Sequence, residues 1–200
     1  MAYVLGLIAT DGCISKSGTV SLCINDRELL EKVKLAMGSE HIIKSHKHQE
    51  ALYGFRFARE RLTSDLKNLG ILPRKSLTIG FPNVPDAFTA DFIRGVFDGD
   101  GSIYFEKRSS SHPVRTSFVS GSQEFIEKLE AALKQLGLPK RVIHKQKTKN
   151  GTHHKIRYSH EDSKKLFKVM YYNTQNELFL ERKYKKFLDG SRFFSDSDLE

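Results

Sequence analysis

The chain has 200 residues, 38% of them apolar and 28% charged, which excludes a disordered chain, a collagen-like repeat and a disulfide-stabilised miniprotein. No apolar run approaches the roughly 18–20 residues that span a bilayer, so we expect no membrane segment. With two cysteines and a formal net charge of +9, we expect an intracellular, non-secreted protein of the cytoplasm, the nucleoid or an organelle matrix.

The first half of the chain predicts the order helix, two strands, helix, two strands, helix. An apolar helical segment ends abruptly at Asp11-Gly12, where a turn follows. After it, strand patterns alternate with helix patterns. These are a strand at 18–24, a helix that includes 28–33 and ends at Gly38, paired strands at 42–48 and 53–59 with a turn near 49–50, and a last helix with the basic doublet Arg74-Lys75.

The second half repeats this order. Residues 3–12 return as residues 92–101, with an aspartate followed by a glycine at the end of each copy. The other elements of the second copy are a strand at 114–119, a helix that includes 124–129 and ends at Gly137, paired strands at 141–147 and 154–159 with a turn at 150–151, and a last helix with the doublet Arg182-Lys183.

This repetition predicts an α+β protein built from a duplicated αββαββα unit. Each copy forms an antiparallel four-stranded sheet with helices on one face, and the copies pack about a pseudo-two-fold axis because neither buries much core alone. We expect an N-terminal repeat at 1–80, a linker at 81–90 around the prolines, a C-terminal repeat at 91–190 and a flexible acidic tail at 191–200.

The positive charge is concentrated in the second half. Residues 140–186 contain 14 Lys and Arg against 4 Asp and Glu, an excess larger than that of the whole chain. Basic residues at this density are typical of a surface that binds a polyanion, because each neutralised phosphate releases counterions. Charge alone is equally consistent with a solvated surface that binds no ligand.

The duplicated segment carries the residues expected to perform chemistry. Gly6 and Gly95 occupy the same repeat position, and small residues there let two helix backbones approach closely. If these helices cross, Asp11 and Asp100 lie together at two helix C-termini, where free carbonyls and helix dipoles favour a cation. A hard divalent ion relieves the repulsion between two carboxylates and activates water to hydrolyse a phosphodiester. For either copy alone, a simple helix stop and turn is the alternative.

Other metal and nucleotide sites find no support in the sequence. An EF-hand loop starting at Asp98 needs Gly at its sixth position and Glu at its twelfth, where the chain has Ile103 and Ser109. The eight histidines come with no Cys-x-x-Cys pair and no zinc-finger spacing. Neither a phosphate-binding glycine loop nor a dinucleotide fingerprint occurs, so an ATPase or an oxidoreductase is not indicated.

Residues 5–12 and 93–101 resemble the paired signature segments of the LAGLIDADG homing endonucleases, in their single-chain, two-motif form. The resemblance extends over nearly the whole chain, because the strands and helices after each motif also match. It implies that the motif helices form the interface between the halves. The first motif departs from the pattern at Ala9, where the second has Asp98.

The resemblance also implies roles for particular residues. It assigns Mg²⁺ binding to Asp11 and Asp100, beside the scissile phosphates, with the backbone carbonyls of Thr10 and Gly99 as further ligands. The family tends to place a basic residue near each active centre, and Lys75 and Lys183 match in repeat position. For these two lysines, ordinary placement at a helix end is the alternative.

The outer face of each sheet is expected to bind DNA, because strands in the major groove can present Arg, Ser and Thr to bases and Lys to phosphates. Strand alternation predicts most of the residues that face outward, and the basic doublets add two more. Lys145 and Lys147 come from the expected strand at 141–147, which does not alternate cleanly. The expected contacts are Thr19, Ser21, Arg56, Arg74, Arg115, Ser117, Lys145, Lys147, Lys155, Arg157 and Arg182.

The sequence therefore predicts a monomeric, Mg²⁺-dependent, site-specific endonuclease that cuts each strand of a double-stranded DNA target once. The unequal charge of the halves favours a long asymmetric target, and the resemblance implies a minor-groove position at the centre and short 3′ overhangs. One alternative is a DNA- or RNA-binding regulator or intron maturase on the same fold. Another is a non-specific basic chromatin-type protein. A free-standing, intron or intein origin is left open.

Overall fold

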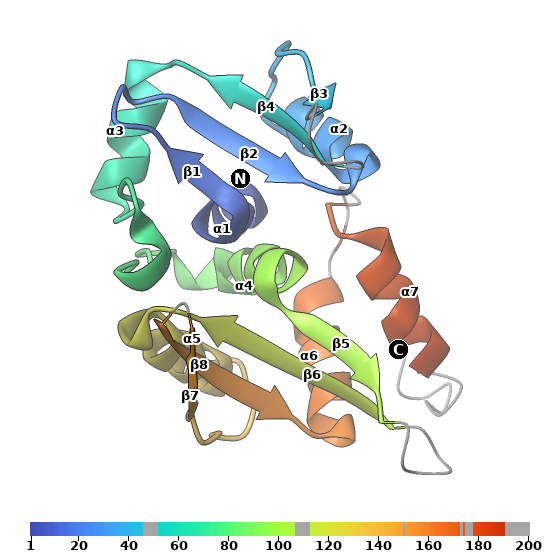
Figure 1. Ribbon diagram of the computed structural model, residues 1–200. Helices are drawn as coiled ribbons and strands as arrows, with labels where there is room; N and C mark the ends of the chain where they lie inside the picture. The colour runs from blue at the N-terminus through green and yellow to red at the C-terminus, as the bar shows by residue number, and fades with distance from the viewer. Residues whose placement is uncertain (46–51, 107–112, 150, 173, 175–177, 191–200) are drawn as a thin grey trace.

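The computed structural model consists of two α+β halves that pack through a central pair of helices (Figure 1). It describes residues 1–45, 52–106, 113–149, 151–172, 174 and 178–190. No helix within these residues is long and apolar enough to cross a membrane. The predicted α+β class is confirmed.

The N-terminal half folds in the predicted order. Its elements are α1 (Ala2–Asp11), β1 (Gly12–Ile14), β2 (Val20–Ile24), α2 (Arg27–Ala36), β3 (Lys44–Ser45), β4 (Tyr53–Phe57), α3 (Glu60–Asn68) and the short 3₁₀ helix η1 (Lys75–Leu77). The strands form an antiparallel four-stranded sheet in the order β1-β2-β4-β3.

The C-terminal half repeats this architecture. Its elements are α4 (Asp86–Asp100), β5 (Ser102–Phe105), β6 (Val114–Ser120), α5 (Gln123–Gln135), β7 (His144–Thr148), β8 (Gly151–Tyr158), α6 (His160–Tyr171) and α7 (Glu181–Gly190). The sheet order β5-β6-β8-β7 matches that of the first half, which confirms the duplication. The two sheets lie on either side of α1 and α4 (Figure 1).

Some element boundaries differ from the sequence prediction. Helix α4 begins at Asp86 directly after Pro85, so residues 86–90 of the expected linker are its first turns. Residues 42–43 and 141–143 are not in strands, which agrees with their poor alternation of apolar and polar residues. The expected turn at 49–50 and the acidic tail at 191–200 lie outside the described residues.

Local sequence explains where the helices begin and end. The Asp26 side chain accepts a hydrogen bond from the backbone N–H of Leu29 at 2.9 Å and caps α2. Ser122 caps α5 in the same way. After the two helices, Gly38 and Gly137 adopt φ of +58° and +89°, the left-handed conformation that glycine adopts most readily. Both glycine stops are therefore confirmed.

Alternating side chains of the strands build the core of each half. In β4, Phe55 and Phe57 are buried while Arg56 between them is exposed, as predicted. In the C-terminal half an aromatic cluster anchors α7, because the fully buried Phe187 packs its ring 5.6 Å from that of Phe97 and 5.2 Å from that of Phe167. This packing fixes α7 beside the end of α4.

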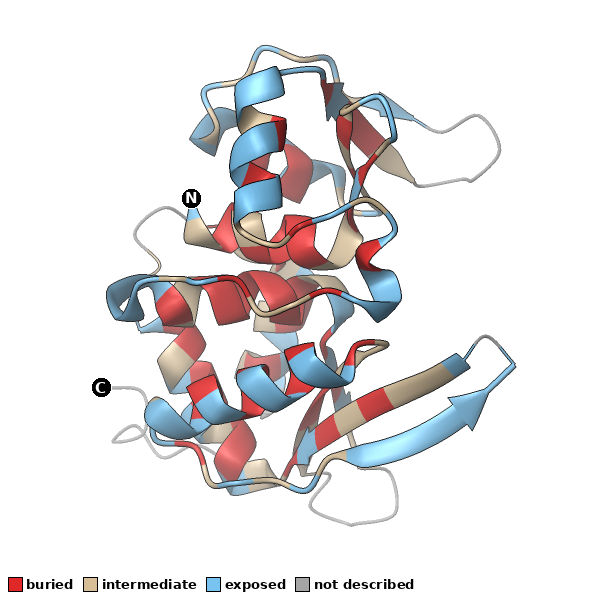
Figure 2. Ribbon diagram, turned by 90° about the vertical axis from the view of Figure 1, so that its left-hand side faces the viewer, coloured by how far each residue is buried: buried red, intermediate tan, exposed pale blue. Residues whose placement is uncertain are grey.

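The interface between the halves is the crossing of α1 and α4, both of which are largely buried (Figure 2). A Cβ atom on Gly6 would lie 2.9 Å from the Cα of Gly95, and one on Gly95 would overlap the carbonyl of Tyr3. Only glycine at these two positions allows the backbones to approach this closely. The predicted contact between the motif helices is confirmed.

Candidate active site

The crossing brings the C-terminal ends of α1 and α4 together. Gly12 and Gly101 follow the two helices in extended conformations and lead directly into β1 and β5. At this end, a Cβ atom on Gly99 would lie 2.9 Å from the Oδ2 atom of Asp11. The carboxylate of the first motif therefore lies against the last turn of the second, as the sequence predicts.

Asp11 and Asp100 form a pair of coupled carboxylates. Burial, and then the charge of Asp100, raise the pKa of Asp11 to about 6. Desolvation also raises the pKa of Asp100, although its side chain is still accessible. Within the described residues, neither carboxylate has a hydrogen-bond or ion-pair partner. Two adjacent, unpartnered carboxylates are a donor set suited to a hard divalent cation.

The protein offers few other ligands at this place. Among the residues that the structure describes, no group of three His, Cys, Asp or Glu side chains is arranged to hold a metal ion. A cation between Asp11 and Asp100 would need further oxygen ligands from backbone, water or a bound phosphate. Magnesium sites commonly combine one or two carboxylates with water and substrate oxygens.

Lys75 lies beside this pair at the start of η1. Its side chain is buried, and its Nζ atom donates a hydrogen bond to the carbonyl of Thr10 at 3.1 Å. The preceding Arg74 has φ of +59°, a left-handed conformation that aims the chain back toward α1. Burial lowers the pKa of Lys75, while Asp100 and Asp11 act in the opposite direction.

Lys183 is the second buried lysine at the site. Its Nζ atom donates to the carbonyls of Phe97, Asp98 and Gly101 at 2.5, 2.8 and 2.6 Å and lies 3.4 Å from that of Gly99. The carbonyls of Asp98 and Gly99 belong to the last turn of α4, where a helix C-terminus leaves carbonyls without intrahelical partners, and Gly101 is the residue that follows the helix. Burial lowers the pKa of Lys183 to about 8. The ammonium group thus completes the end of α4 and faces the paired carboxylates.

Both lysines act on both aspartates, because the charges of Lys75 and Lys183 each act to lower the pKa of Asp11 and of Asp100. Their hydrogen bonds keep each ammonium group at the motif helix of its own half, with Lys75 at the end of α1 and Lys183 at the end of α4. The repeat alignment predicts that both lysines are near the site, but it contains no information on the carbonyls that hold them.

The backbone carbonyls expected to bind the metal ion also contact lysine side chains. The carbonyls of Thr10 and Gly99 each lie within hydrogen-bond distance of a lysine Nζ atom. A carbonyl oxygen has two lone pairs, so coordination of a cation by these two atoms remains a prediction. Among the described residues, the carboxylates of Asp11 and Asp100 differ from these carbonyls in having no hydrogen-bond or ion-pair partner.

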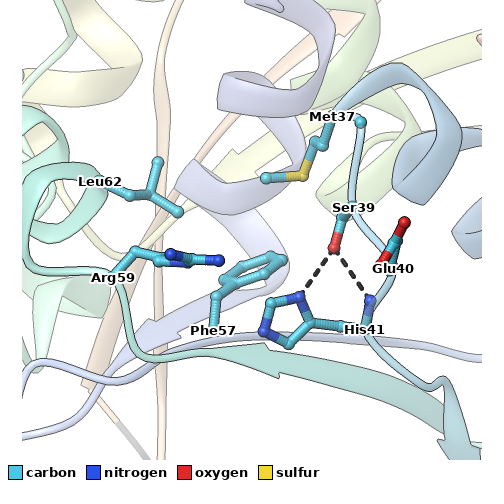
Figure 3. Close-up of a pocket in the computed structure, with 8 residues that line it drawn as sticks. Met37, Ser39, Glu40, His41, Phe57, Arg59 and Leu62 are labelled. Carbon is cyan, nitrogen blue, oxygen red and sulfur yellow. Dashed lines mark hydrogen bonds between the residues drawn. The ribbon is translucent and has the colours of Figure 1, made fainter.

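Two cavities flank the carboxylate pair, one on each side. One of about 270 Å³ is lined by Asp11, Asp98 and Arg182, and the other, of about 420 Å³, by Lys75 and Asp100. A larger cavity of about 620 Å³ lies elsewhere, between the end of α2 and β4, where Ser39 hydrogen-bonds His41 (Figure 3). It contains neither aspartate, so cavity size does not locate the site.

Most of the residues expected to bind DNA are accessible. Every residue of β7 is exposed, and Figure 2 shows the β7–β8 hairpin projecting from the body. The accessible members of the set, in part or in full, are Thr19, Ser21, Arg56, Arg74, Lys145, Lys147, Lys155, Arg157 and Arg182.

Two residues of that set differ from expectation. Ser117 has the predicted outward parity but is only 2% exposed, because it lies on a central strand between Ser102 and Arg157. The expectation that its side chain is accessible on the outer face is therefore wrong. Arg115 is half-buried and paired with Glu106 at 2.8 Å, so its guanidinium is already neutralised.

A family model described as the LAGLIDADG-like domain matches residues 1–74 and 87–171, which covers both halves. The chain belongs to this family. The resemblance predicted from the two motifs is thereby confirmed. Both matched segments contain one motif helix and one four-stranded sheet, so the family match follows the duplication seen in the structure.

One curated relative is the probable translation initiation factor IF-2 of Methanocaldococcus jannaschii, 26% identical over 175 residues. The matched region is 82% of this LAGLIDADG protein but only 13% of the archaeal protein's length.

Two solved structures share the fold at low identity. A variant of I-DmoI in complex with its target DNA in the presence of Mn has a TM-score of 0.58 and 19% identity, covering 88% of this chain and 96% of that one. The meganuclease I-SmaMI bound to uncleavable DNA has a TM-score of 0.61 and 14% identity, covering 96% and 87%. The predicted duplicated fold is that of these two proteins.

Proposed function

We propose that this LAGLIDADG protein is a site-specific endonuclease that hydrolyses one phosphodiester in each strand of a double-stranded DNA target. The observation that carries the proposal is the pair of unpartnered carboxylates, Asp11 and Asp100, flanked by two buried lysines at the junction of the two sheets. The fold shared with I-DmoI and I-SmaMI, both of which were solved with DNA, supports it.

In this proposal Asp11 and Asp100 would hold Mg²⁺, and the bound ion would supply a nucleophilic water and neutralise charge on the phosphate. The protein itself positions the reacting groups, because the crossing of α1 and α4 holds the two carboxylates close together. Lys75 and Lys183 offset the negative charge that gathers where the scissile phosphates lie, and their backbone hydrogen bonds keep the ammonium groups there.

The unequal charge of the two halves supports a long asymmetric target bound by a monomer. Among the described residues, the C-terminal sheet exposes Lys145, Lys147 and Arg157, and the N-terminal sheet exposes Arg56 and Lys44. Phosphate contacts supply affinity and orientation, while contacts to base edges select sequence. The C-terminal half therefore contributes more of the salt-dependent affinity.

Selection of cleaved sites from a randomised DNA library tests this function. We expect one long site to be enriched with Mg²⁺ and none with EDTA. Tight, metal-independent binding of DNA or RNA without cleavage would instead indicate a regulator or a maturase. Weak binding with no preferred sequence and a steep salt dependence would indicate a non-specific basic protein.

A divalent ion should stabilise the protein in a pH-dependent way. Because the folded-state pKa of Asp11 is raised to about 6, ionising Asp11 costs stability as the pH rises from the ordinary aspartate value through 6. Mg²⁺ binds the ionised form. A Mg²⁺ concentration about ten times its Kd should therefore raise the melting temperature by about 3 °C at pH 7.5 and much less at pH 5. Equal shifts at both pH values, measured by differential scanning fluorimetry, would contradict this site, as would a shift in the Asp11→Asn/Asp100→Asn variant.

The lysines of β7 should contribute through phosphates. Replacing Lys145 and Lys147 with Ala should weaken binding to all sequences and reduce the slope of log Kd against log salt by about 2. The matched control replaces Lys67 and Lys134, which are exposed on α3 and α5, and removes the same charge. If both double variants reduce the slope equally, the β7 surface is not the DNA-binding face.

A further inference from the structure

The two motif helices differ at two positions, and in the second helix both residues contact the segment 178–180 that precedes α7. The second motif has Arg94 and Asp98 where the first has Leu5 and Ala9. Arg94 and Asp98 are only 5% and 4% exposed, so both are ionisable groups inside the protein. Burying such groups is costly unless they are hydrogen-bonded or paired, and the contacts they make show what the second half gains.

Asp98 connects three elements. Its Oδ2 atom accepts a hydrogen bond from the Tyr3 hydroxyl of α1 at 2.8 Å and another from the backbone N–H of Leu180 at 2.8 Å. Leu180 immediately precedes α7, and its carbonyl accepts from the backbone N–H of Lys183 and Tyr184. The Asp98 carboxylate thus links the residue that precedes α7 to the last turn of α4 by a hydrogen bond.

Arg94, one helical turn before Asp98, also bonds the segment that precedes α7. Its Nε atom donates to the carbonyl of Leu178 at 2.9 Å, and its guanidinium also bonds the carbonyl of Met170 at 2.6 Å and the carboxylate of Asp91 at 2.7 Å. The segment 178–180 is therefore bonded to α4 at both ends.

The position of Lys183 depends on this segment. Lys183 lies three residues after Leu180, so one helical turn separates the backbone bond to Asp98 from the ammonium group at the carbonyls of α4. The segment that carries Lys75 cannot be held in this way, because Leu5 and Ala9 have no polar side-chain group at the matching positions.

We propose that Asp98 and Arg94 are positioning residues that hold the 178–180 segment against α4 and thereby fix Lys183 at the active site. The inference rests on the proposed endonuclease function and deepens it, because it makes one of the two strand cuts dependent on a support that the other lacks. Since Lys183 bonds the carbonyls at the end of α4, where Asp100 is the last residue, the affected cut is the one that depends on Asp100.

Strand-resolved cleavage tests the proposal. Asp11→Asn and Asp100→Asn first establish which labelled strand depends on which aspartate. Asp98→Ala is then expected to slow the Asp100-dependent cut by about 100-fold, the usual cost of misplacing a group by about an ångström, with a smaller change in the other. Asp98→Asn keeps an acceptor for Leu180 and Tyr3 and should restore most of the rate. An equal loss in both strands, or a loss that Asp98→Asn does not relieve, would overturn the proposal.

A second measurement does not depend on cleavage. Lys183 is buried and should react slowly with an amine-modifying reagent, as read by mass spectrometry. Asp98→Ala should increase its labelling several-fold while that of Lys75 stays constant, and the milder Tyr3→Phe should act in the same direction. The control is Ser163→Ala, which removes a buried hydrogen bond to Thr116 in the same half without touching α7. Unchanged Lys183 labelling in folded Asp98→Ala and Tyr3→Phe proteins would refute the positioning role. If the labelling changes but wild type cuts no DNA, the proposed function fails and the positioning role stands.

Discussion

Replacing both Asp11 and Asp100 with Asn is expected to abolish cleavage of both DNA strands while leaving DNA binding largely intact. The exchange preserves side-chain shape but removes the charges that hold a divalent ion. Metal ions lower phosphoryl-transfer barriers by several kcal/mol, so the loss should be about 1,000-fold or more. Cleavage of a supercoiled plasmid carrying the selected site measures the rate, and gel shift in Ca²⁺ measures binding. Cleavage at the wild-type rate by the double variant would contradict the proposed function.

The single variants should behave as nicking enzymes. Each carboxylate belongs to one motif, so Asp11→Asn and Asp100→Asn should each leave one strand cut faster than the other, and the two variants should prefer opposite strands. A shared centre in which both carboxylates serve both cuts would instead slow the strands equally. The comparison therefore distinguishes two paired sites from one common site.

These variants should also show that activity is lost without loss of folding. The raised pKa of Asp11 means that its ionised form is disfavoured in the metal-free protein at pH 7.5. Asparagine carries no charge, so metal-free Asp11→Asn should melt at an equal or higher temperature than wild type. This trade of stability for activity is common at catalytic sites.

The duplication made the centre of the fold predictable from sequence. Gly6 and Gly95 recur at matched positions, and only a close helix crossing requires glycine in both copies. Once the crossing is inferred, the meeting of Asp11 and Asp100 follows from their place at the helix ends. The chemistry of each motif alone was ambiguous, because a helix that stops at Asp-Gly is common.

The supports around the pair were not predictable. The bonds of Lys183 to the end of α4 join residues more than 80 positions apart, and no local pattern encodes them. The departure at Ala9 and Asp98 was visible, but its meaning depends on where Leu180 lies. The predicted accessibility of Ser117 was wrong for a related reason. Strand alternation predicts which face of the sheet a side chain lies on, but not whether neighbouring groups cover it.

The largest expected loss of stability comes from Gly95→Ala. By helix propensity alone, alanine should stabilise α4 by about 1 kcal/mol. The added Cβ atom would overlap the carbonyl of Tyr3 and lie 3.0 Å from the Cα of Gly6, and both obstacles are backbone atoms that cannot rotate away. The helices must separate, which opens the interface between the halves. We expect a net destabilisation of about 3 kcal/mol or more in urea unfolding, as for severe overpacking.

Gly80→Ala is the matched control, because the nearest atom to a Cβ there is a Glu124 side-chain oxygen at 3.8 Å. That variant should stay within about 0.5 kcal/mol of wild type. Where Gly95→Ala still folds, the separated helices should also move Asp11 away from Asp100, so the Mg²⁺-induced rise in melting temperature should shrink. A Gly95→Ala protein as stable as wild type, with an undiminished response to Mg²⁺, would mean that the backbones of α1 and α4 do not touch and that their crossing does not hold the two carboxylates together.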